Sequence, residues 1–405
     1  MQPSRFSRRS RALIRSANLH APRLSVLFLE GAPLAYHMAA SLAQRRDVEV
    51  HCLSDEKSFA GRSRYFKSFA LHERFSEPAD FLACVKEGVV RTGAKVVLPV
   101  TERSTRWLIQ HRRALQEFVS VPPLPSLETF EIVSNKRGLW EFQRTHSLSG
   151  APTVYAVGTR GREAFENSPL EYPLLLKPSV GQSGEGITLI KTPRELADWK
   201  QSAGHDRREY IAQKYIPGHD IDCSLISVDG EIVVHTVQQR ASAESGATLE
   251  VFSGGEALQA VRPLLQAIGY SGIAHIDMRH DAADGRLTIV DFNPRCWASL
   301  FSSTCAGVNF PYLWCQLALE QPVVQPMFER IHHYSSSATL RHCLQSILHP
   351  TAARPKFKWK NSSLPSALAD PLPLLAKAGA TLRRAIQRNA SPKPESYGMQ
   401  PALRP

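Results

Sequence analysis

Residues 272–295, GIAHIDMRHDAADGRLTIVDFNPR, predict two β-strands joined by a turn-rich loop that contains Asp284-Gly285. The strands are expected at 273–279 and 286–292. Each carries one acid among apolar neighbours, Asp277 in the first strand and Asp291 in the second. Whether the two carboxylates meet depends on how the strands pair.

Three oxygen-bearing side chains of this hairpin are predicted to converge. Asn293 follows Asp291 by two residues, so the alternation of side chains along a strand puts both on one face. If His280 pairs with Arg286, Asp277 lies on that face too, diagonal to Asp291. Two carboxylates and an amide oxygen suit Mg²⁺ that bridges nucleotide phosphates. The alternative is an ordinary surface hairpin whose acids face water.

The composition indicates a globular protein of two or three domains. Of 405 residues, 43% are hydrophobic and 21% are charged. No apolar run reaches the roughly 18 residues of a membrane span. The net charge of +12 is concentrated at the ends, because residues 1–23 contain six Arg and no acid, and residues 354–405 contain ten Lys or Arg against two acids. Cations interleaved with aromatic residues are absent, so we expect no nucleic-acid partner.

Cysteine usage predicts a reducing compartment. The seven cysteines are scattered, odd in number and without a C-x-x-C pair. This pattern indicates reduced thiols in a cytoplasmic protein and gives no support for a structural zinc site.

The first part of the chain predicts a tail followed by a parallel sheet. Residues 1–22, rich in Arg and Ser, are expected to form a disordered basic tail, although the composition also suits an organellar transit peptide. Apolar runs at 24–29, 48–53 and 95–99 alternate with helical patterns, which predicts a Rossmann-like domain over 23–122. The glycine fingerprint of dinucleotide sites is missing after the first strand, so NAD is not predicted.

A second informative stretch is 172–190, YPLLLKPSVGQSGEGITLI, which predicts two antiparallel strands around a glycine-rich loop. Backbone N–H groups of such a loop can fold over phosphates, and Lys177 can supply a point charge. The Walker sequence is absent, so a P-loop NTPase is excluded. A plain flexible hairpin is the alternative interpretation.

Three further segments carry weaker signals. Residues 126–147 are expected to form one helix that contains Lys136, and 298–319 are expected to be helical. Residues 213–216 form an extended segment whose backbone can face an adenine edge. Asp220 lies just beyond a Pro-Gly turn and can accept from ribose hydroxyls, and Arg240 ends the next strand.

In this order, the motifs resemble those of the ATP-grasp superfamily, most closely the branch of the carbamoyl-phosphate synthetase large subunit, biotin carboxylase and carboxylate–amine ligases. The order is a lysine in a helix, strand-Lys-Pro with a glycine loop, Y-I-P-G, and a carboxylate followed by D-F-N-P-R, over about 24–321. The resemblance implies an α/β and α+β fold with a Rossmann-like domain, an ATP-grasp domain over 123–325, and a partly disordered C-terminal extension over 326–405.

The resemblance assigns nucleotide-binding roles to individual positions. Lys136 and Lys177 match the lysines that hold the α- and β-phosphates. The remaining nucleotide-binding positions are Gly181, Gln182, Ser183, Gly184 and Gly186 in the mobile loop, Gln213, Lys214, Tyr215 and Ile216 in the adenine hinge, and Asp220 at the ribose.

Metal-binding and catalytic roles follow in the same way. Asp277, Asp291 and Asn293 match the ligands of Mg²⁺, for which Mn²⁺ can substitute. Arg295 matches the cation near the transferred phosphoryl group, and Arg240 matches a basic residue that some relatives place near the acyl phosphate. Together with Lys177 these arginines are the predicted catalytic residues.

The implied activity is an ADP-forming ligase that joins a small carboxylate to an amine through an acyl phosphate. The chain departs from the family at two positions, since Glu is usual where Asp291 and Lys214 stand. A non-catalytic ATP-binding protein and a carboxylase- or kinase-type ATP-grasp enzyme are therefore alternatives. No biotin-carrier lysine motif is present, which disfavours the carboxylase.

Residues 374–389 predict an amphipathic basic helix in the C-terminal extension. Such a helix can lie on an anionic membrane. Packing on the body of the protein, or on a second copy in a homodimer, is the favoured interpretation.

Overall fold

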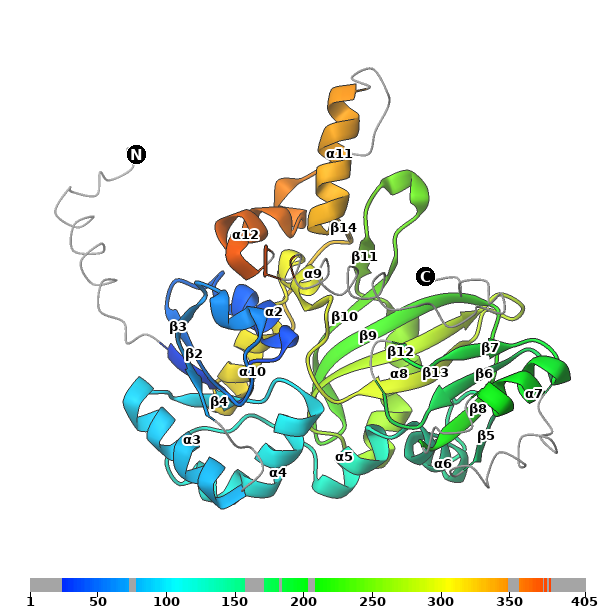
Figure 1. The fold of residues 1–405 in the computed structure, drawn as a ribbon, viewed down its shortest axis with the longest axis horizontal. Helices are drawn as coiled ribbons and strands as arrows, with labels where there is room; N and C mark the ends of the chain where they lie inside the picture. Colours follow the sequence, from blue (N-terminus) through cyan, green and yellow to red (C-terminus); the bar gives the residue numbers. More distant parts are fainter. Residues whose placement is uncertain are drawn as a thin grey trace, which may run out of the picture.

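The computed structural model describes residues 24–72, 78–156, 171–181, 184–202, 208–348, 357–373, 375–376 and 379. Three sheets organise the described residues, and Figure 1 shows them as a parallel sheet at the N-terminal end, a large central sheet and a small sheet beside it. None of the described helices is long and apolar enough to cross a membrane.

The N-terminal sheet is parallel, as the alternation of strands and helices predicts, with the order β3-β2-β1-β4. Its strands are β1 (Leu24–Phe28), β2 (Val48–Ser54), β3 (Phe66–Leu71) and β4 (Val96–Leu98). Its helices are α2 (Pro33–Leu42), η1 (Phe59–Arg62), α3 (Pro78–Thr92) and α4 (Glu102–Gln116). Val26, Phe28 and Leu98 are fully buried because helices cover the sheet.

The central sheet is antiparallel, with the order β13-β12-β9-β10-β11-β14. Its strands are β9 (Gly218–Val228), β10 (Glu231–Arg240), β11 (Leu249–Phe252), β12 (Gly272–Asp281), β13 (Leu287–Asn293) and β14 (Ile331–His333). The short helix η3 (Ala243–Ser245) lies between β10 and β11, and α8 (Gly255–Ile268) between β11 and β12.

Side-chain alternation gives this sheet two different faces. Cys223, Val237, Ile276 and Phe292 point to one face and form a buried core with apolar residues of α8. The residues between them in sequence point to the other face, and many of these are polar. The hydrophobic effect therefore fixes which side of the sheet remains available for chemistry.

The register of the central hairpin differs from the predicted one. His280 pairs with Leu287 rather than Arg286, and an unbroken ladder in that register would place Val290 opposite Asp277. A bulge after Asp277 shifts the pairing by one residue, so that Asp277 lies directly opposite Asp291. The prediction of a shared face is therefore confirmed, but by a bulge that sequence alternation did not indicate.

The small sheet is also antiparallel, with the order β5-β8-β6-β7. Its strands are β5 (Thr153–Ala156), β6 (Leu174–Pro178), β7 (Thr188–Ile190) and β8 (Tyr210–Lys214), and α7 (Pro193–Ser202) packs on β7. Leu174, Leu176, Ile190 and Ala212 form its core.

One predicted helix is broken in the structure, and a second predicted helical region consists of two helices. The helix predicted at 126–147 is α5 (Leu127–Val133) and α6 (Lys136–Thr145), because Asn135 caps α6 with its side-chain oxygen. The helical segments predicted over 298–319 are α9 (Leu300–Cys305) and α10 (Phe310–Ala318), as expected. Gly307 at φ 101° lies between them, and Asn309 caps α10.

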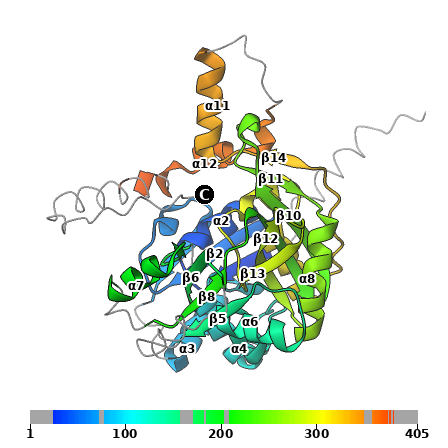
Figure 2. The same ribbon diagram turned by 90° about the vertical axis from the view of Figure 1, so that its right-hand side faces the viewer.

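Part of the C-terminal extension forms helices within the described residues. After β14 come α11 (Ser336–Leu348), η4 (Trp359–Asn361) and α12 (Leu364–Ala369). Figures 1 and 2 both show α11 projecting from the body, whereas α12 returns to the N-terminal domain. Asp370 accepts hydrogen bonds there from the Ser63 hydroxyl and the Arg64 amide. Most of the helix predicted at 374–389 lies outside the described residues.

Candidate nucleotide and metal site

A row of polar side chains crosses the open face of the central sheet. Gln238 on β10 pairs with Asp222 on β9, Asp222 with Asp277 on β12, and Asp277 with Asp291 on β13. Directly opposite residues of an antiparallel ladder share a face and lie close together. Three carboxylates are therefore neighbours on three adjacent strands.

A second row runs beside the first, two residues along each strand. It contains Ser224, His275 and Asn293. The His275 ring stacks on Trp297 with centroids 5.2 Å apart, and its Nδ1 lies 2.9 Å from Ser224 Oγ. Its Nε2 lies 3.4 Å from Asp277 Oδ1. The two rows form a compact polar cluster.

Burial governs the protonation of this cluster. Burial, together with the charge of Asp220, raises the pKa of Asp222 to about 7. Burial and the charges of Asp222 and Asp291 raise the pKa of Asp277 well above its ordinary value. Burial, then Arg295, lowers the pKa of His275 to about 3. The ring is therefore neutral, and the carboxylates gain no counter-charge from it.

Two lysines approach the carboxylates from other elements. Lys136 is the first residue of α6, and its Nζ lies 2.8 Å from Asp291 Oδ2. Lys177, on β6 and only 6% exposed, donates to Gln213 Oε1 at 2.7 Å. Burial lowers the pKa of Lys177 to about 8, although Asp291 favours its charged form. Residues far apart in sequence thus place two ammonium groups at one site.

Arg295 links this cluster to the N-terminal domain. The side chain is 9% exposed and donates to Glu102 Oε1 at 3.2 Å and to Asn293 Oδ1 at 3.0 Å. Glu102 begins α4, and burial raises its pKa against the opposing effect of Arg295. The Asn293 oxygen therefore faces Arg295, while its amide nitrogen is 3.5 Å from Asp277 Oδ2. Its predicted role as a metal ligand requires this amide to turn.

The predicted adenine hinge is held by hydrogen bonds to neighbouring segments. The Lys214 amide donates to Pro152 O and the Tyr215 amide to Pro173 O. The Ile216 carbonyl accepts from Arg279 at 3.0 Å, and Asp220 pairs with the same guanidinium at 2.7 Å. Arg279 thus contacts the Ile216 carbonyl and the Asp220 carboxylate, which were expected to face adenine and ribose.

The predicted glycine loop is described in part. Gln182 and Ser183 lie outside the described residues, and Gly181 follows β6. Gly184 and Gly186 have φ values of 72° and 76°, a conformation that favours glycine. A Cβ on Gly186 would also lie 2.9 Å from Pro178 Cγ, so a larger residue would displace the loop.

Arg240, the last residue of β10, is exposed and lies two residues beyond Gln238 on the same face. Sequence reasoning missed Asp222, His275, Glu102 and Arg279. Asp222 had a usable signal, since it follows Asp220 by the same two-residue step that joins Asp291 to Asn293.

The donor set fits a hard divalent cation. Asp222, Asp277 and Asp291 provide carboxylate oxygens in one row, and burial together with neighbouring acids raises the pKa values of the first two. One ligand atom from each of Asp222, His275 and Asp277 lies within 4.8 Å of the others. A cation among these oxygens would offset their mutual repulsion.

A further ion-pair network lies where the strands of the parallel sheet end. Arg103 of α4 donates to Glu30 at 2.7 Å and to Asp55 at 2.6 Å. Glu30 follows β1 and Asp55 follows β2. Ligands of open α/β sheets bind outside the carboxyl ends of the strands. Arg103 follows Glu102 in the sequence, and Glu102 pairs with Arg295. Consecutive residues of α4 therefore contact this edge of the parallel sheet and Arg295.

Comparisons with known proteins agree with this architecture. Residues 206–338 match the family model described as ATP-grasp in the biosynthetic pathway with Ter operon. The chain is 26% identical over 229 residues to D-aspartate ligase of Enterococcus faecium (strain Aus0004). The aligned region covers 49% of this chain and 53% of that protein. The chain thus spans about half the length of this relative.

Two solved structures have a similar fold. N5-carboxyaminoimidazole synthetase from Staphylococcus aureus, complexed with ADP, gives a TM-score of 0.60 at 15% identity, over 83% of this chain and 93% of that one. L-amino acid ligase from Bacillus licheniformis gives 0.55 at 17% identity, over 75% and 76%.

The parallel N-terminal sheet, the two antiparallel sheets and these neighbours define the class of protein, which has the ATP-grasp fold. The match over 206–338, the similarity to D-aspartate ligase and the shared fold agree with the resemblance to the ATP-grasp superfamily that the motif order predicted.

Proposed function

We propose that this protein is an ATP- and Mg²⁺-dependent ligase that joins a carboxylate to an amine through an acyl phosphate. The observation that carries the proposal is the row Asp222–Asp277–Asp291, with Lys136, Lys177 and Arg295 gathered around it. Further support comes from the printed names of two similar proteins, a D-aspartate ligase and an L-amino acid ligase.

In the proposed binding mode the triphosphate lies between the central and small sheets. Lys136 and Lys177 bind its α- and β-phosphates, and the loop of Gly184 and Gly186 closes over them and excludes water. Arg279 and the hinge at Ile216 border the nucleoside.

Asp222, Asp277 and Asp291 would hold Mg²⁺, and Asn293 would join them only if its amide turned away from Arg295. The cation supplies charge neutralisation to the phosphate oxygens during transfer. Because Lys136 already contacts Asp291, the carboxylates also orient one of the phosphate-binding lysines.

The reaction proceeds in two displacements. An oxygen of the substrate carboxylate attacks the γ-phosphorus, and the bond to the β-phosphate oxygen breaks to release ADP. Arg295, fixed by Glu102, offsets the charge that develops on the transferred group. The amine nitrogen then attacks the acyl carbon, phosphate leaves, and the amine loses a proton as the amide forms.

The test is a phosphate-release screen with Mg²⁺-ATP and pairs of D- or L-amino acids and small carboxylates. An active pair releases ADP and phosphate in equal amounts. Hydroxylamine in place of the amine yields a hydroxamate, which reports the acyl phosphate. We expect Lys177→Ala and Asp291→Ala to lower turnover about a hundredfold or more, since each removes charge stabilisation at the transferred group.

Lys95→Ala and Asp198→Ala are matched controls, because both side chains are exposed and lie outside the proposed site. Turnover that is indifferent to Lys177→Ala and Asp291→Ala would remove the assigned site. ATP binding without turnover for any pair would favour the non-catalytic alternative. That alternative is considered because Lys214 and Asp291 differ from the glutamates usual in the family.

A further inference from the structure

A cavity of about 710 Å³ lies away from the row of carboxylates, and none of its lining residues belongs to the site described above. Its walls come from three parts of the chain. The segment after α2 supplies Gln44 and Arg45, the α9–α10 region supplies residues between Phe301 and Leu313, and the C-terminal extension supplies residues between Trp359 and Ser366. This volume is in the range of small-molecule sites.

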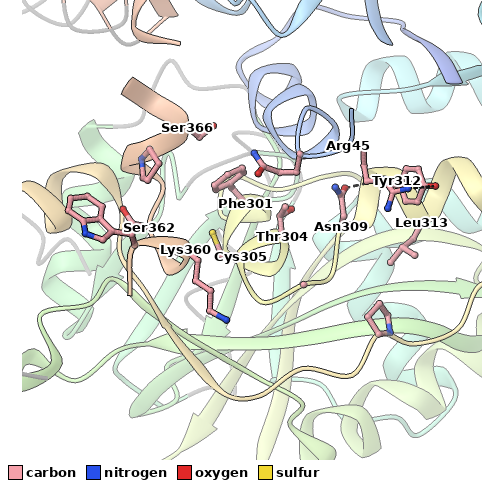
Figure 3. Close-up of a pocket in the computed structure, with 15 residues that line it drawn as sticks. Arg45, Phe301, Thr304, Cys305, Asn309, Tyr312, Leu313, Lys360, Ser362 and Ser366 are labelled. Carbon is pink, nitrogen blue, oxygen red and sulfur yellow. Dashed lines mark hydrogen bonds between the residues drawn. The ribbon is translucent and has the colours of Figure 1, made fainter. Parts of the chain in front are cut away.

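The cavity has an apolar wall with polar groups at its edges. Figure 3 shows Phe301, Thr304 and Cys305 between Lys360 on one side and the Arg45–Tyr312 pair on the other. Leu313 and Trp359 add to the apolar lining. Such a surface suits a ligand with an aromatic or aliphatic body.

The charge of the lining is positive. Arg45 and Lys360 are its charged residues, and the lining contains no Asp or Glu. The Arg45 guanidinium lies 4.3 Å from the Tyr312 ring centroid and donates to the Tyr312 hydroxyl, while Asp47 pairs with it at 3.3 Å. Lys360 pairs with no acid among the residues the structure describes. Its ammonium group therefore remains available to an anion.

The walls are fixed in place by contacts between the three parts. Asn309 donates to the Ser41 carbonyl at 2.7 Å, and Thr304 donates to the Ser41 hydroxyl at 2.9 Å. On the other side, the Tyr65 hydroxyl donates to the Ser366 carbonyl at 2.7 Å. A pocket held in this way is formed before a ligand binds, which reduces the entropic cost of binding.

We propose that this cavity is a second ligand site that binds a small organic anion, with its acid group at Lys360 and its apolar body against Phe301 and Leu313. The end of the chain itself is a poor occupant, because residues 377–405 carry six Lys or Arg and one acid, Glu395. A ligand there contacts the C-terminal extension and the body together and stabilises their attachment.

The test uses the full chain and 8-anilinonaphthalene-1-sulfonate, an anionic aromatic probe whose fluorescence reports binding. Saturating Mg²⁺-ADP occupies the nucleotide site. We expect saturable one-to-one binding with quenching of Trp359, and Lys360→Gln to weaken it about two- to fivefold. Lys360→Glu should weaken it about tenfold, because it replaces attraction by repulsion.

Lys358→Gln is the matched control, since Lys358 is exposed two residues away and does not line the cavity. The neutral analogue N-phenyl-1-naphthylamine should bind more weakly than the sulfonate. Amides of 357–370 should exchange more slowly with the anionic probe bound. Equal affinity of the two probes, indifference to Lys360→Glu, or the absence of saturable binding would each overturn the proposal.

Discussion

Asp222 lies at the centre of the candidate site although the sequence analysis did not predict it there. Its neighbour Asp220 was predicted to bind ribose, yet Asp220 pairs with Arg279, whereas Asp222 faces Asp277 at the centre of the acidic row. A buried carboxylate with like-charged neighbours is held at a cost in free energy. That cost should make the unfolding free energy depend on pH in a way that can be measured.

We expect the unfolding free energy of the wild-type protein, without divalent ions, to fall as pH rises from about 4 to about 7. The folded-state pKa of Asp222 is raised from 3.8 to about 7, so the folded state binds its proton more tightly and loses that advantage across this window. Asp222→Asn removes this loss of stability and should raise the unfolding free energy at pH 8 by up to about 4 kcal/mol. Urea denaturation at several pH values measures the difference.

Mg²⁺ should stabilise the wild type at pH 8 more than the Asp222→Asn variant, because the cation offsets the same repulsion. Asp198→Asn, an exposed change on α7, is the control and should alter neither the pH profile nor the Mg²⁺ effect. A wild-type pH profile identical to that of Asp222→Asn would contradict the assignment of Asp222 to the cluster.

At the scale of elements, two local irregularities build the site. The bulge in β13 brings Asp291 opposite Asp277. The break between α5 and α6 makes Lys136 the first residue of a helix, so that its amide donates to the Ser179 carbonyl and its ammonium reaches Asp291. Neither feature would exist in an unbroken strand or helix.

Asn135→Ala tests the second irregularity. The Asn135 side chain accepts from the Arg137 and Gly138 amides, so its loss should cost about 1 kcal/mol of stability. It should also weaken ATP binding several-fold, because the orientation of Lys136 depends on this cap. Denaturant unfolding and nucleotide titration measure the two effects.

Ser126→Ala is the matched control, since Ser126 caps α5 through the Thr129 amide without touching the site. It should cost similar stability and leave ATP affinity unchanged. Equal losses of affinity in both variants would mean that helix stability alone, and not the placement of Lys136, controls binding.

At the scale of the whole molecule, the predicted N-terminal and ATP-grasp domains share one core. Leu98 and Leu108 of the first pack in the same cluster as Trp297, Phe310 and Trp314 of the second. The pair Glu102–Arg295 crosses this boundary and connects α4 to the acidic row through Asn293. The first domain therefore helps to position a proposed catalytic arginine.

A double-mutant cycle on Glu102→Gln and Arg295→Gln should give a coupling energy of about 1–3 kcal/mol in unfolding experiments, because each partner is left buried and uncompensated when the other is removed. The exposed pair Arg262–Glu231, 3.3 Å apart, is the control and should couple by less than about 1 kcal/mol. Strictly additive effects at Glu102 and Arg295 would show that the domains are not joined there.

The sequence by itself determined the properties that depend on local periodicity and motif order. Alternation within β13 put Asp291 and Asn293 on one face, and alternating strands and helices predicted the parallel sheet. The order of motifs identified the superfamily. Side-chain alternation is a reliable signal because burial of one face of a strand fixes the orientation of every second side chain.

Only the tertiary structure decided which groups actually meet. The bulge opposite Asp277 sets the register of one hairpin. The ion pair of Glu102 with Arg295 and the contacts of Arg279 with Ile216 and Asp220 join segments distant in sequence. The cavity at Lys360 needs three such segments at once. Such contacts depend on how whole elements pack, and a local pattern carries no information about a partner that lies a hundred residues away.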